Sequence, residues 1–311
     1  MKTLNLILNL ISCSLSWLMG TGLKGCAFNI RTPKTLILVE KGFTILPTEI
    51  PNLSFFRNLQ QRGKAIILNG VVDFADSTPD DDLGKRSATG KEYLTLKHPY
   101  KWKFTFDNGL NFYKALNYLE SNERYDLILL DDKGDMLLAS GRDGSAKGLD
   151  LGLLSNGKYM IGNENSQSIT VQIDRLDFDK NVSWIPASEL DFSPNDLDGV
   201  NDISLAIAPL AVAGTSLVVT TLLGDKSHFV DGLILANFKV KKTVGGVTTT
   251  ITPTGTAVAD ATAKTYTLTI PTATAATVYS VETFDSTLNV STILTATGDL
   301  YRGNVATVTV P

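Results

Sequence analysis

Residues 100–119, YKWKFTFDNGLNFYKALNYL, change their hydrophobic period halfway along. The first half carries aromatic side chains at alternate positions, which are Tyr100, Trp102, Phe104 and Phe106. This alternation predicts a β-strand with one buried and one solvated face. In the second half apolar residues recur every three positions, at Leu110, Tyr113, Leu116 and Leu119. That spacing predicts an amphipathic helix, capped by Asp107 or Asn108 and ending near Asn122.

The segments on both sides of this stretch predict a β-rich domain over residues 27–195. The expected strands lie in TLILVEKG (35–42), KAIILNGVVDF (64–74), YLTLKHPYKWKFTFDNG (93–109), YDLILLDDKGDMLLAS (125–140) and SITVQIDRLDF (168–178). Lys133 and Gly134 mark a hairpin turn within the fourth segment. The sequence therefore predicts about eight strands around one helix, an α+β domain of β-sandwich or barrel type.

A polar segment, Ala75–Glu92, separates two of these expected strands. A loop of about 18 residues is long for a compact domain, and such loops tend to be functional or disordered. In a subunit that polymerises, its charges of both signs would suit a polar contact with a neighbouring copy. Simple mobility is the alternative, and the sequence favours neither.

The C-terminal part, residues 200–311, has a different composition. From residue 243 onward it is dominated by Thr, Val and Ala, and β-branched side chains favour strands. About seven short strands follow one another at intervals of roughly ten residues, with Gly, Pro and Asn between them, which is typical of an immunoglobulin-like β-sandwich. This region contains no cysteine, so it lacks the paired cysteines of antibody domains.

Residues 1–26 begin with a charged start and an apolar run, and they support three interpretations. Gly20, Gly22 and Gly25 have the spacing of a dinucleotide-binding turn, with Glu40 near the position of a ribose-binding acid. Such a turn needs a helix that opens at the third glycine, whereas Pro33 and a predicted strand follow here. The dinucleotide interpretation is therefore disfavoured.

The two other interpretations concern how the apolar run is used. Leu23–Cys26 looks like the site where a bacterial lipoprotein is cleaved and acylated, although Lys24 is unusual at such a site. The interpretation that we favour is an apolar N-terminal arm, residues 1–26, that is retained and buried against a neighbouring subunit. The run is too short and too polar for a membrane-spanning helix.

Composition limits the chemistry that the chain can perform. The sequence has 28 basic and 32 acidic residues, a net charge of −4, so a nucleic-acid partner is not suggested. Cys13 and Cys26 are the only cysteines, and His98 and His228 the only histidines. These numbers disfavour a cysteine-based zinc site, a disulfide framework and a histidine-based catalytic site. We expect no enzyme activity, no catalytic residues and no cofactor.

Two acidic clusters contain the carboxylates that a metal site would need. Asp80, Asp81 and Asp82 lie beside Lys85 in the long polar segment. The second cluster, SPNDLDGVND (193–202), has part of the calcium-loop order, but Pro194 and Leu205 occupy positions that require acidic ligands; the cluster contains Asp196, Asp198 and Gly199. Solvated loops and turns are the better interpretation, and no metal is expected.

The order of these features resembles that of the major tail-tube proteins of tailed bacteriophages, with a general likeness to virion proteins of Bacteroidota phages. The resemblance rests on FTFDNGLNFYKALNYLESNERYDLILLDDKGDML (104–137), on the closing strand SITVQIDRLDF (168–178) and on the appended immunoglobulin-like domain. It implies stacked, possibly hexameric rings, contacts with other virion proteins, and location in the virion. It also implies an outward domain that makes weak contacts with host surfaces or glycans, and it brings no active site.

A second hypothesis stays open beside the virion protein. The chain would be a Bacteroidota surface lipoprotein or pilin-like adhesin, acylated at Cys26 and located at the bacterial cell surface. The two hypotheses make opposite predictions about the first 25 residues, which the mature lipoprotein would lack.

Overall fold

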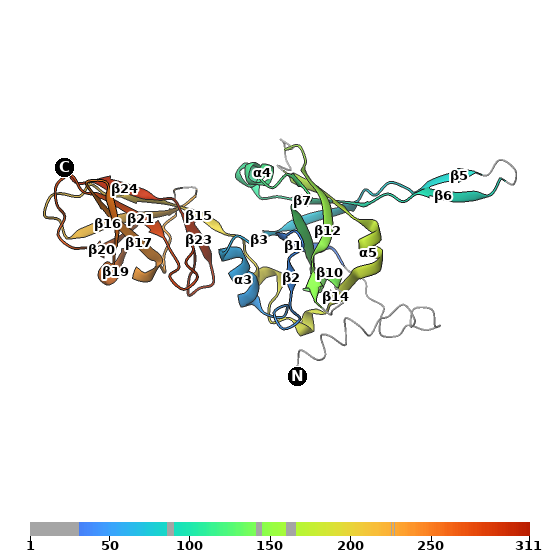
Figure 1. The fold of residues 1–311 in the computed structure, drawn as a ribbon, viewed down its shortest axis with the longest axis horizontal. Coiled ribbons are helices and arrows are strands. Elements are labelled where there is room, and N and C mark those ends of the chain that lie inside the picture. Colours follow the sequence, from blue (N-terminus) through green and yellow to red (C-terminus); the bar gives the residue numbers. More distant parts are fainter. Residues whose placement is uncertain (1–30, 86–89, 141–144, 160–165, 225, 227) are drawn as a thin grey trace. The chain divides into compact units, whose positions relative to one another are not determined.

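The structure, a computed structural model, describes residues 31–85, 90–140, 145–159, 166–224, 226 and 228–311. They form two compact units, which are residues 31–56 with Lys64–Leu197 and Arg57–Gly63 with Asp198–Pro311. Both units consist mainly of β-strands, as the sequence predicts (Figure 1). The predicted N-terminal arm, residues 1–26, and Cys26 within it lie outside the described residues.

The N-terminal unit contains fourteen strands within the described ranges. They are β1 (Pro33–Glu40), β2 (Thr44–Ile45), β3 (Ala65–Asn69), β4 (Val71–Asp76), β5 (Asp82–Lys85), β6 (Glu92–Leu96), β7 (Tyr100–Phe106), β8 (Ser121–Asn122), β9 (Tyr125–Asp131), β10 (Met136–Ser140), β11 (Ala146–Lys147), β12 (Leu149–Asn156), β13 (Gln167–Ile173) and β14 (Val182–Ile185). Its helices are α3 (Leu53–Gln61, in which the division between the units falls after Phe56), α4 (Gly109–Asn117) and α5 (Arg175–Asn181), with short 3-10 turns at Ala187–Glu189 and Pro194–Asp196.

A sheet that returns to its first strand forms the centre of this unit. Its strands pair antiparallel in the order β3, β1, β9, β12, β13, β7, β4. Only Gly70 separates β3 from β4, so one bent stretch of chain pairs with β1 at one end and with β7 at the other. Gly70 has a φ of +84°, which glycine adopts without the steric cost that other residues meet. The sheet is therefore a barrel.

Side chains from all of these strands fill the barrel. The strand β7 contributes its alternate aromatic residues, and Trp102, Phe104 and Phe106 are all buried, as the period of two predicts. Other buried members of the same cluster are Leu36, Leu38, Leu68, Val71, Leu116, Tyr125, Leu127, Leu129, Leu137, Ala139, Leu149, Leu151, Leu154, Ile169, Val171 and Ile173. The ring of Phe112 on α4 lies 5.1 Å from that of Phe106, which places this helix against the barrel.

The strand β9 continues the sheet beyond the barrel. It pairs with β12 near Leu127 and with β10 near Leu129, and β10 in turn pairs with β11 and β14. All seven residues of β9 are buried. Its odd-numbered apolar residues face the barrel, and Ile128 and Leu130 are equally inaccessible on the other face. A run of apolar residues without alternation, YDLILLD, is typical of a strand covered on both faces.

The helices differ from the sequence prediction in number and extent. The described residues form three helices, where one was predicted, and α4 ends at Asn117 instead of near Asn122. Ser121 and Asn122 form β8 and pair with β12, because hydrogen bonds to a neighbouring strand replace a last helical turn. Asn108 occupies the N-cap position without a side-chain cap, and its amide instead donates to the Asn69 carbonyl at 3.3 Å.

The predicted strand at 168–178 is too long. The strand β13 ends at Ile173, and α5 begins directly after Asp174. The Asp174 carboxylate accepts the backbone N–H of Asp177 at 2.6 Å, which caps the helix. Asp174, a residue type that favours helix N-caps, was the feature of the sequence that marked the end of the strand. The helix α3 was not predicted; its apolar residues Phe56 and Leu59 have helical spacing and are buried.

The polar segment Ala75–Glu92 is not a loop throughout. Its residues end β4, form all of β5 and begin β6, and β5 and β6 pair as an antiparallel hairpin. Asp, Gly and Lys are poor strand formers, so the local sequence did not predict this hairpin. The segment 93–109, expected as one strand, is divided between β6 and β7.

The C-terminal unit is a β-sandwich. Its strands are β15 (Asn201–Ile207), β16 (Ser216–Leu223), β17 (Phe238–Val244), β18 (Val247–Ile251), β19 (Thr254–Asp260), β20 (Thr265–Thr269), β21 (Val278–Thr283), β22 (Thr292–Leu294), β23 (Leu300–Gly303) and β24 (Ala306–Thr309), with a 3-10 turn at Leu235–Asn237. One sheet has the order β19, β20, β16, β15, β23, β22 and the other β18, β17, β21, β24.

This sheet order has the immunoglobulin-like topology. When the strands are lettered in chain order and β22 and β23 are set aside, one sheet reads D, E, B, A and the other C′, C, F, G. The strands β22 and β23 form an additional hairpin between F and G, and β23 joins β15 in parallel. The predicted immunoglobulin-like sandwich is therefore confirmed as a fold.

Two tyrosines in the sandwich core differ in their polar contacts. The hydroxyl of Tyr266 donates to the Val230 carbonyl at 3.0 Å and accepts the Leu233 N–H at 3.1 Å. The hydroxyl of Tyr279, equally buried, has no hydrogen-bond partner among the described residues. Burial raises the pKa of both phenols. The Tyr266 hydroxyl therefore holds the loop that contains Val230 and Leu233 in place. Tyr279 contributes to the core only through the packing of its ring.

Candidate functional site

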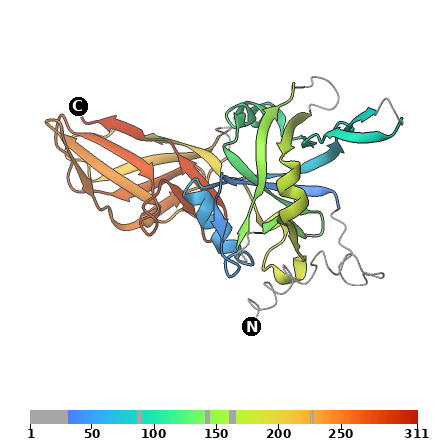
Figure 2. The same ribbon diagram turned by 45° about the vertical axis from the view of Figure 1, so that its right-hand side comes forward.

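The hairpin of β5 and β6, here named the arm, is the most unusual feature of the N-terminal unit. In the part of the chain that the structure describes, these strands pair only with each other. Figure 1 and the turned view in Figure 2 both show the arm extending away from the barrel, with no other element beside it. A two-stranded hairpin without a packing partner is only marginally stable in water.

One face of the arm is apolar and exposed. Leu83 is paired with Leu94, and Leu96 follows on the same strand; their exposed fractions are 58%, 47% and 51%. Beside them Lys85 pairs with Glu92 across the hairpin, with Nζ and Oε1 3.3 Å apart. Leucines that remain half-exposed on a hairpin form a contiguous apolar surface, which is typical of an interaction site.

The other face of the arm carries a close contact. Tyr93 is paired with Gly84 across the hairpin. A Cβ atom added at Gly84 would lie 2.7 Å from the carbon Cζ of the Tyr93 ring. Real Cβ atoms do not approach other atoms so closely, so Tyr93 lies over the bare glycine. The two faces of the arm are thus different, with a tyrosine over glycine on one and leucines on the other.

Charged and aromatic groups hold the base of the arm. Asp81 forms an ion pair with Arg175 of α5, and the Arg175 guanidinium lies 5.4 Å from the centre of the Tyr100 ring. The Tyr100 hydroxyl donates to Asp179 at 3.0 Å. The hydrogen bond to Asp81 raises the pKa of Arg175, and burial with the Asp179 carboxylate raises that of Tyr100. These contacts fix the direction in which the arm leaves the barrel.

The strand β4, which leads into the arm, stands at the end of the strand order that the described residues form. Within the described ranges it pairs with β7 alone. Val72 is 60% exposed, and the neighbouring residues Asp73, Ala75 and Asp76 are exposed as well. An edge strand presents N–H and C=O groups that can pair with a strand of another chain.

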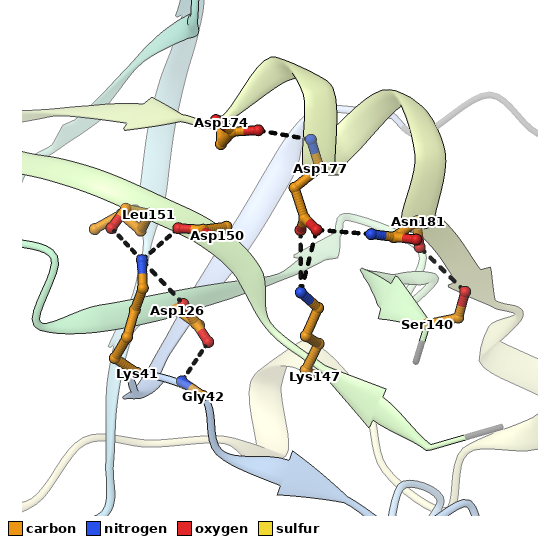
Figure 3. A network of polar contacts seen from close by, with 10 residues as sticks. All are labelled: Lys41, Gly42, Asp126, Ser140, Lys147, Asp150, Leu151, Asp174, Asp177 and Asn181. Carbon is orange, nitrogen blue, oxygen red and sulfur yellow. Dashed lines mark hydrogen bonds and ion pairs between the residues drawn. The ribbon is translucent and has the colours of Figure 1, made fainter. Parts of the chain in front are cut away.

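A polar pocket of about 320 Å³ lies elsewhere on this unit. Lys41, Glu123, Asp150 and Asp174 are among its lining residues. Figure 3 shows the Lys41 amine directed toward Asp150, with which it forms an ion pair, and toward the Leu151 carbonyl at 3.2 Å. The carboxylate of Asp126 lies 3.7 Å from the same amine.

The pKa shifts of this cluster indicate a structural role. Burial lowers the pKa of Lys41, but the hydrogen bond to Asp150 and the surrounding carboxylates outweigh it, and the pKa is raised. Asp126 is almost fully buried and accepts the Gly42 N–H at 2.8 Å; burial raises its pKa. A lysine kept in its charged form is a poor nucleophile and a poor base at neutral pH. The cluster therefore ties the turn after β1 to β9 and β12.

A second polar cluster, also drawn in Figure 3, holds α5 against the sheet. Lys147 on β11 contacts both carboxylate oxygens of Asp177 at 3.2 Å. Asn181 donates to the same carboxylate at 2.6 Å, and the hydroxyl of Ser140 donates to the Asn181 carbonyl at 3.2 Å. Because α5 also carries Arg175, this cluster fixes the helix to which the arm is attached.

The structure places the residues that the sequence singled out in separate surroundings. In the first acidic cluster, Asp81 contacts Arg175 and Asp82 contacts His98, both at the base of the arm. Asp196 accepts the backbone N–H and the hydroxyl of Ser193, both at 2.7 Å, in a 3-10 turn, and so serves the turn that the sequence favoured.

The remaining candidates serve the structure or cannot be placed. The carbonyl of Asp198 accepts the side-chain amide of Gln60 at 2.8 Å. Glu40 forms an ion pair with Lys64 at 2.6 Å. The backbone carbonyl of His228 accepts the Leu223 N–H at 2.9 Å. The glycines of the dinucleotide-like turn, Cys13 and Cys26 lie outside the described residues.

Sequence reasoning missed the apolar face of the arm. Its leucines are isolated among polar residues, so neither a helical nor a long alternating pattern revealed them. Leu94 and Leu96 do stand at alternate positions, and they lie within the segment 93–109 that was predicted as a strand. That alternation was the available signal of a strand.

Comparison with known proteins adds no identity. No protein family matches the sequence, and no curated protein shows significant similarity. In the described part of the chain, no group of three or more His, Cys, Asp or Glu side chains is arranged to hold a metal ion. None of the described helices has the length and apolar character required to span a membrane.

Proposed function

We propose that this chain is a structural subunit of a bacteriophage virion, a tail-tube protein that polymerises into stacked rings. The observation that carries the proposal is the arm, which exposes Leu83, Leu94 and Leu96 without a covering element among the described residues. Burial of such a surface against another molecule is favourable. Every copy presents the same surface, so self-association supplies as many partners as there are arms.

The two folds support the same proposal. A barrel whose interior is filled by large side chains is a rigid building unit, and the ion pairs at the base of the arm hold its direction relative to α5. The immunoglobulin-like sandwich is a separate unit that can be displayed on the outside of an assembly. There, weak contacts with cells or glycans would be multiplied by the number of copies.

Negative-stain electron microscopy of the purified full-length chain tests the proposal. We expect rings or tubes with a regular repeat, and sedimentation velocity should show a species many times heavier than one chain. A monodisperse monomer at every concentration up to the solubility limit would refute a self-assembling subunit.

The second candidate, a surface lipoprotein or adhesin, is favoured by the sequence Leu23–Cys26. Intact-mass spectrometry of the protein from its native source separates the two candidates. The virion subunit is expected to retain residues 1–25 without lipid. A mass that corresponds to a chain beginning at Cys26 with added acyl groups would establish the lipoprotein instead.

A further inference from the structure

The far end of the arm and the strand that leads into the arm differ in charge. Three exposed acidic residues, Asp73, Asp76 and Asp80, form what we call the acidic root. At the far end of the arm the exposed residues Lys85 and Lys91 form the basic tip.

The root also offers a strand edge. Among the described strands only β7 pairs with β4, and along its other edge the described residues provide no pairing strand. Val72 is exposed on this strand. The strand β6 has five residues and β4 has six, so the two can pair over most of their lengths. Addition of a strand to an exposed edge is a common mode of protein recognition, in which side chains on alternate positions provide specificity.

We propose that the arm of one copy docks on the root of a second copy of this chain. The strand β6 pairs along the free edge of β4, the leucine face of the arm covers Val72, and the basic tip lies beside the acidic root. This inference rests on the proposed self-assembly and names the surface that receives the arm.

The stoichiometry of such a contact is consistent with continued growth. Each copy has one arm and one root, and they are different surfaces. A contact between unlike surfaces is repeated from copy to copy, which generates a ring when the rotation closes and a filament when it does not.

A charge-swap experiment on the full-length chain tests the docking. The tip variant is K85Q/K91E, in which glutamine at 85 avoids repulsion with the paired Glu92. The root variant is D73K/D80K; Asp76 is left unchanged because its carboxylate accepts the Thr78 N–H at 2.9 Å. Circular dichroism checks that both variants are folded, and mass photometry measures the mass of each species. A fourfold variant that carries all four changes provides the reciprocal test.

We expect each variant alone to assemble at least tenfold more weakly than the unmodified chain. An equimolar mixture should assemble with the two variants alternating, since the intact tip of the root variant fits the intact root of the tip variant and the two changed surfaces are complementary as well. The fourfold variant should regain self-assembly through the exchanged charges. If the unmodified chain assembles and the mixture does not, or if each variant alone assembles as well as the unmodified chain, the docking is wrong and the proposed function stands. If the unmodified chain does not assemble, the proposed function fails with it.

Discussion

Replacement of Leu83, Leu94 and Leu96 by serine perturbs the apolar face of the arm without touching either core. These side chains are already 47–58% exposed, so the isolated chain loses little stability when they are replaced by polar ones. Full burial of a leucine contributes about 1.5–3 kcal/mol, and about half of that remains to be gained at each position. The three together contribute about 3 kcal/mol to each contact between copies. Because 1.4 kcal/mol corresponds to a factor of ten, we expect the dissociation constant of the assembly to rise about 100-fold.

Sedimentation velocity over a dilution series measures this change, and thermal unfolding of the dilute monomer measures stability. The matched control is L46S/L110S/L176S. These three leucines belong to the same unit, are exposed to a similar degree, 56%, 48% and 59%, and lie outside the arm. The control should assemble as the unmodified chain does, and both variants should unfold at nearly unchanged temperatures.

The reasoning would be refuted by an arm variant that assembles as tightly as the unmodified chain. An equal weakening in the control would refute it too, because the effect would then come from a general loss of surface hydrophobicity. A large fall in the unfolding temperature of the arm variant would show instead that the leucines stabilise the monomer.

Three further changes test the internal chemistry. Tyr279→Phe removes a buried hydroxyl that has no hydrogen-bond partner among the described residues, so chemical unfolding should be unchanged or slightly more difficult. Tyr266→Phe breaks two hydrogen bonds and should cost about 1–2 kcal/mol of unfolding free energy. The pKa of Asp126 in the folded chain is raised above its ordinary value of 3.8, so the folded state binds the proton more tightly than the unfolded state does. The contribution of this carboxyl to stability therefore falls as the pH rises from 3.8 through the folded pKa. The difference in unfolding free energy between the unmodified chain and Asp126→Asn should follow that pH dependence, and a flat difference would contradict it. Gly84→Val must displace the Tyr93 ring, so the hairpin of the arm should open more often. Amide hydrogen exchange in the arm strands should then be faster, and unchanged exchange would contradict the close contact.

The sequence by itself determined which faces of several strands are buried. Alternation of aromatic and polar residues over 100–106 predicted the inward face of β7, and the unbroken apolar run of β9 agrees with a strand covered on both sides. The spacing of the short strands after residue 200 predicted the immunoglobulin-like sandwich. These predictions succeed because a strand has a period of two and burial selects one side of it, so the pattern is present in each segment alone.

Tertiary structure alone decided where elements end and whether a polar segment pairs. Residues 121–122 left the predicted helix because β12 offers them hydrogen bonds, and Asp174 ended a strand that the apolar pattern would have continued. Residues of the polar segment 75–92 became part of the arm because β5 and β6 satisfy each other's backbone groups and because Arg175, nearly one hundred positions further along, holds Asp81. Such contacts join residues that are distant in sequence, so no local pattern records them. The positions of the arm and of its proposed acceptor β4 therefore follow from pairing between strands, which only the folded chain establishes.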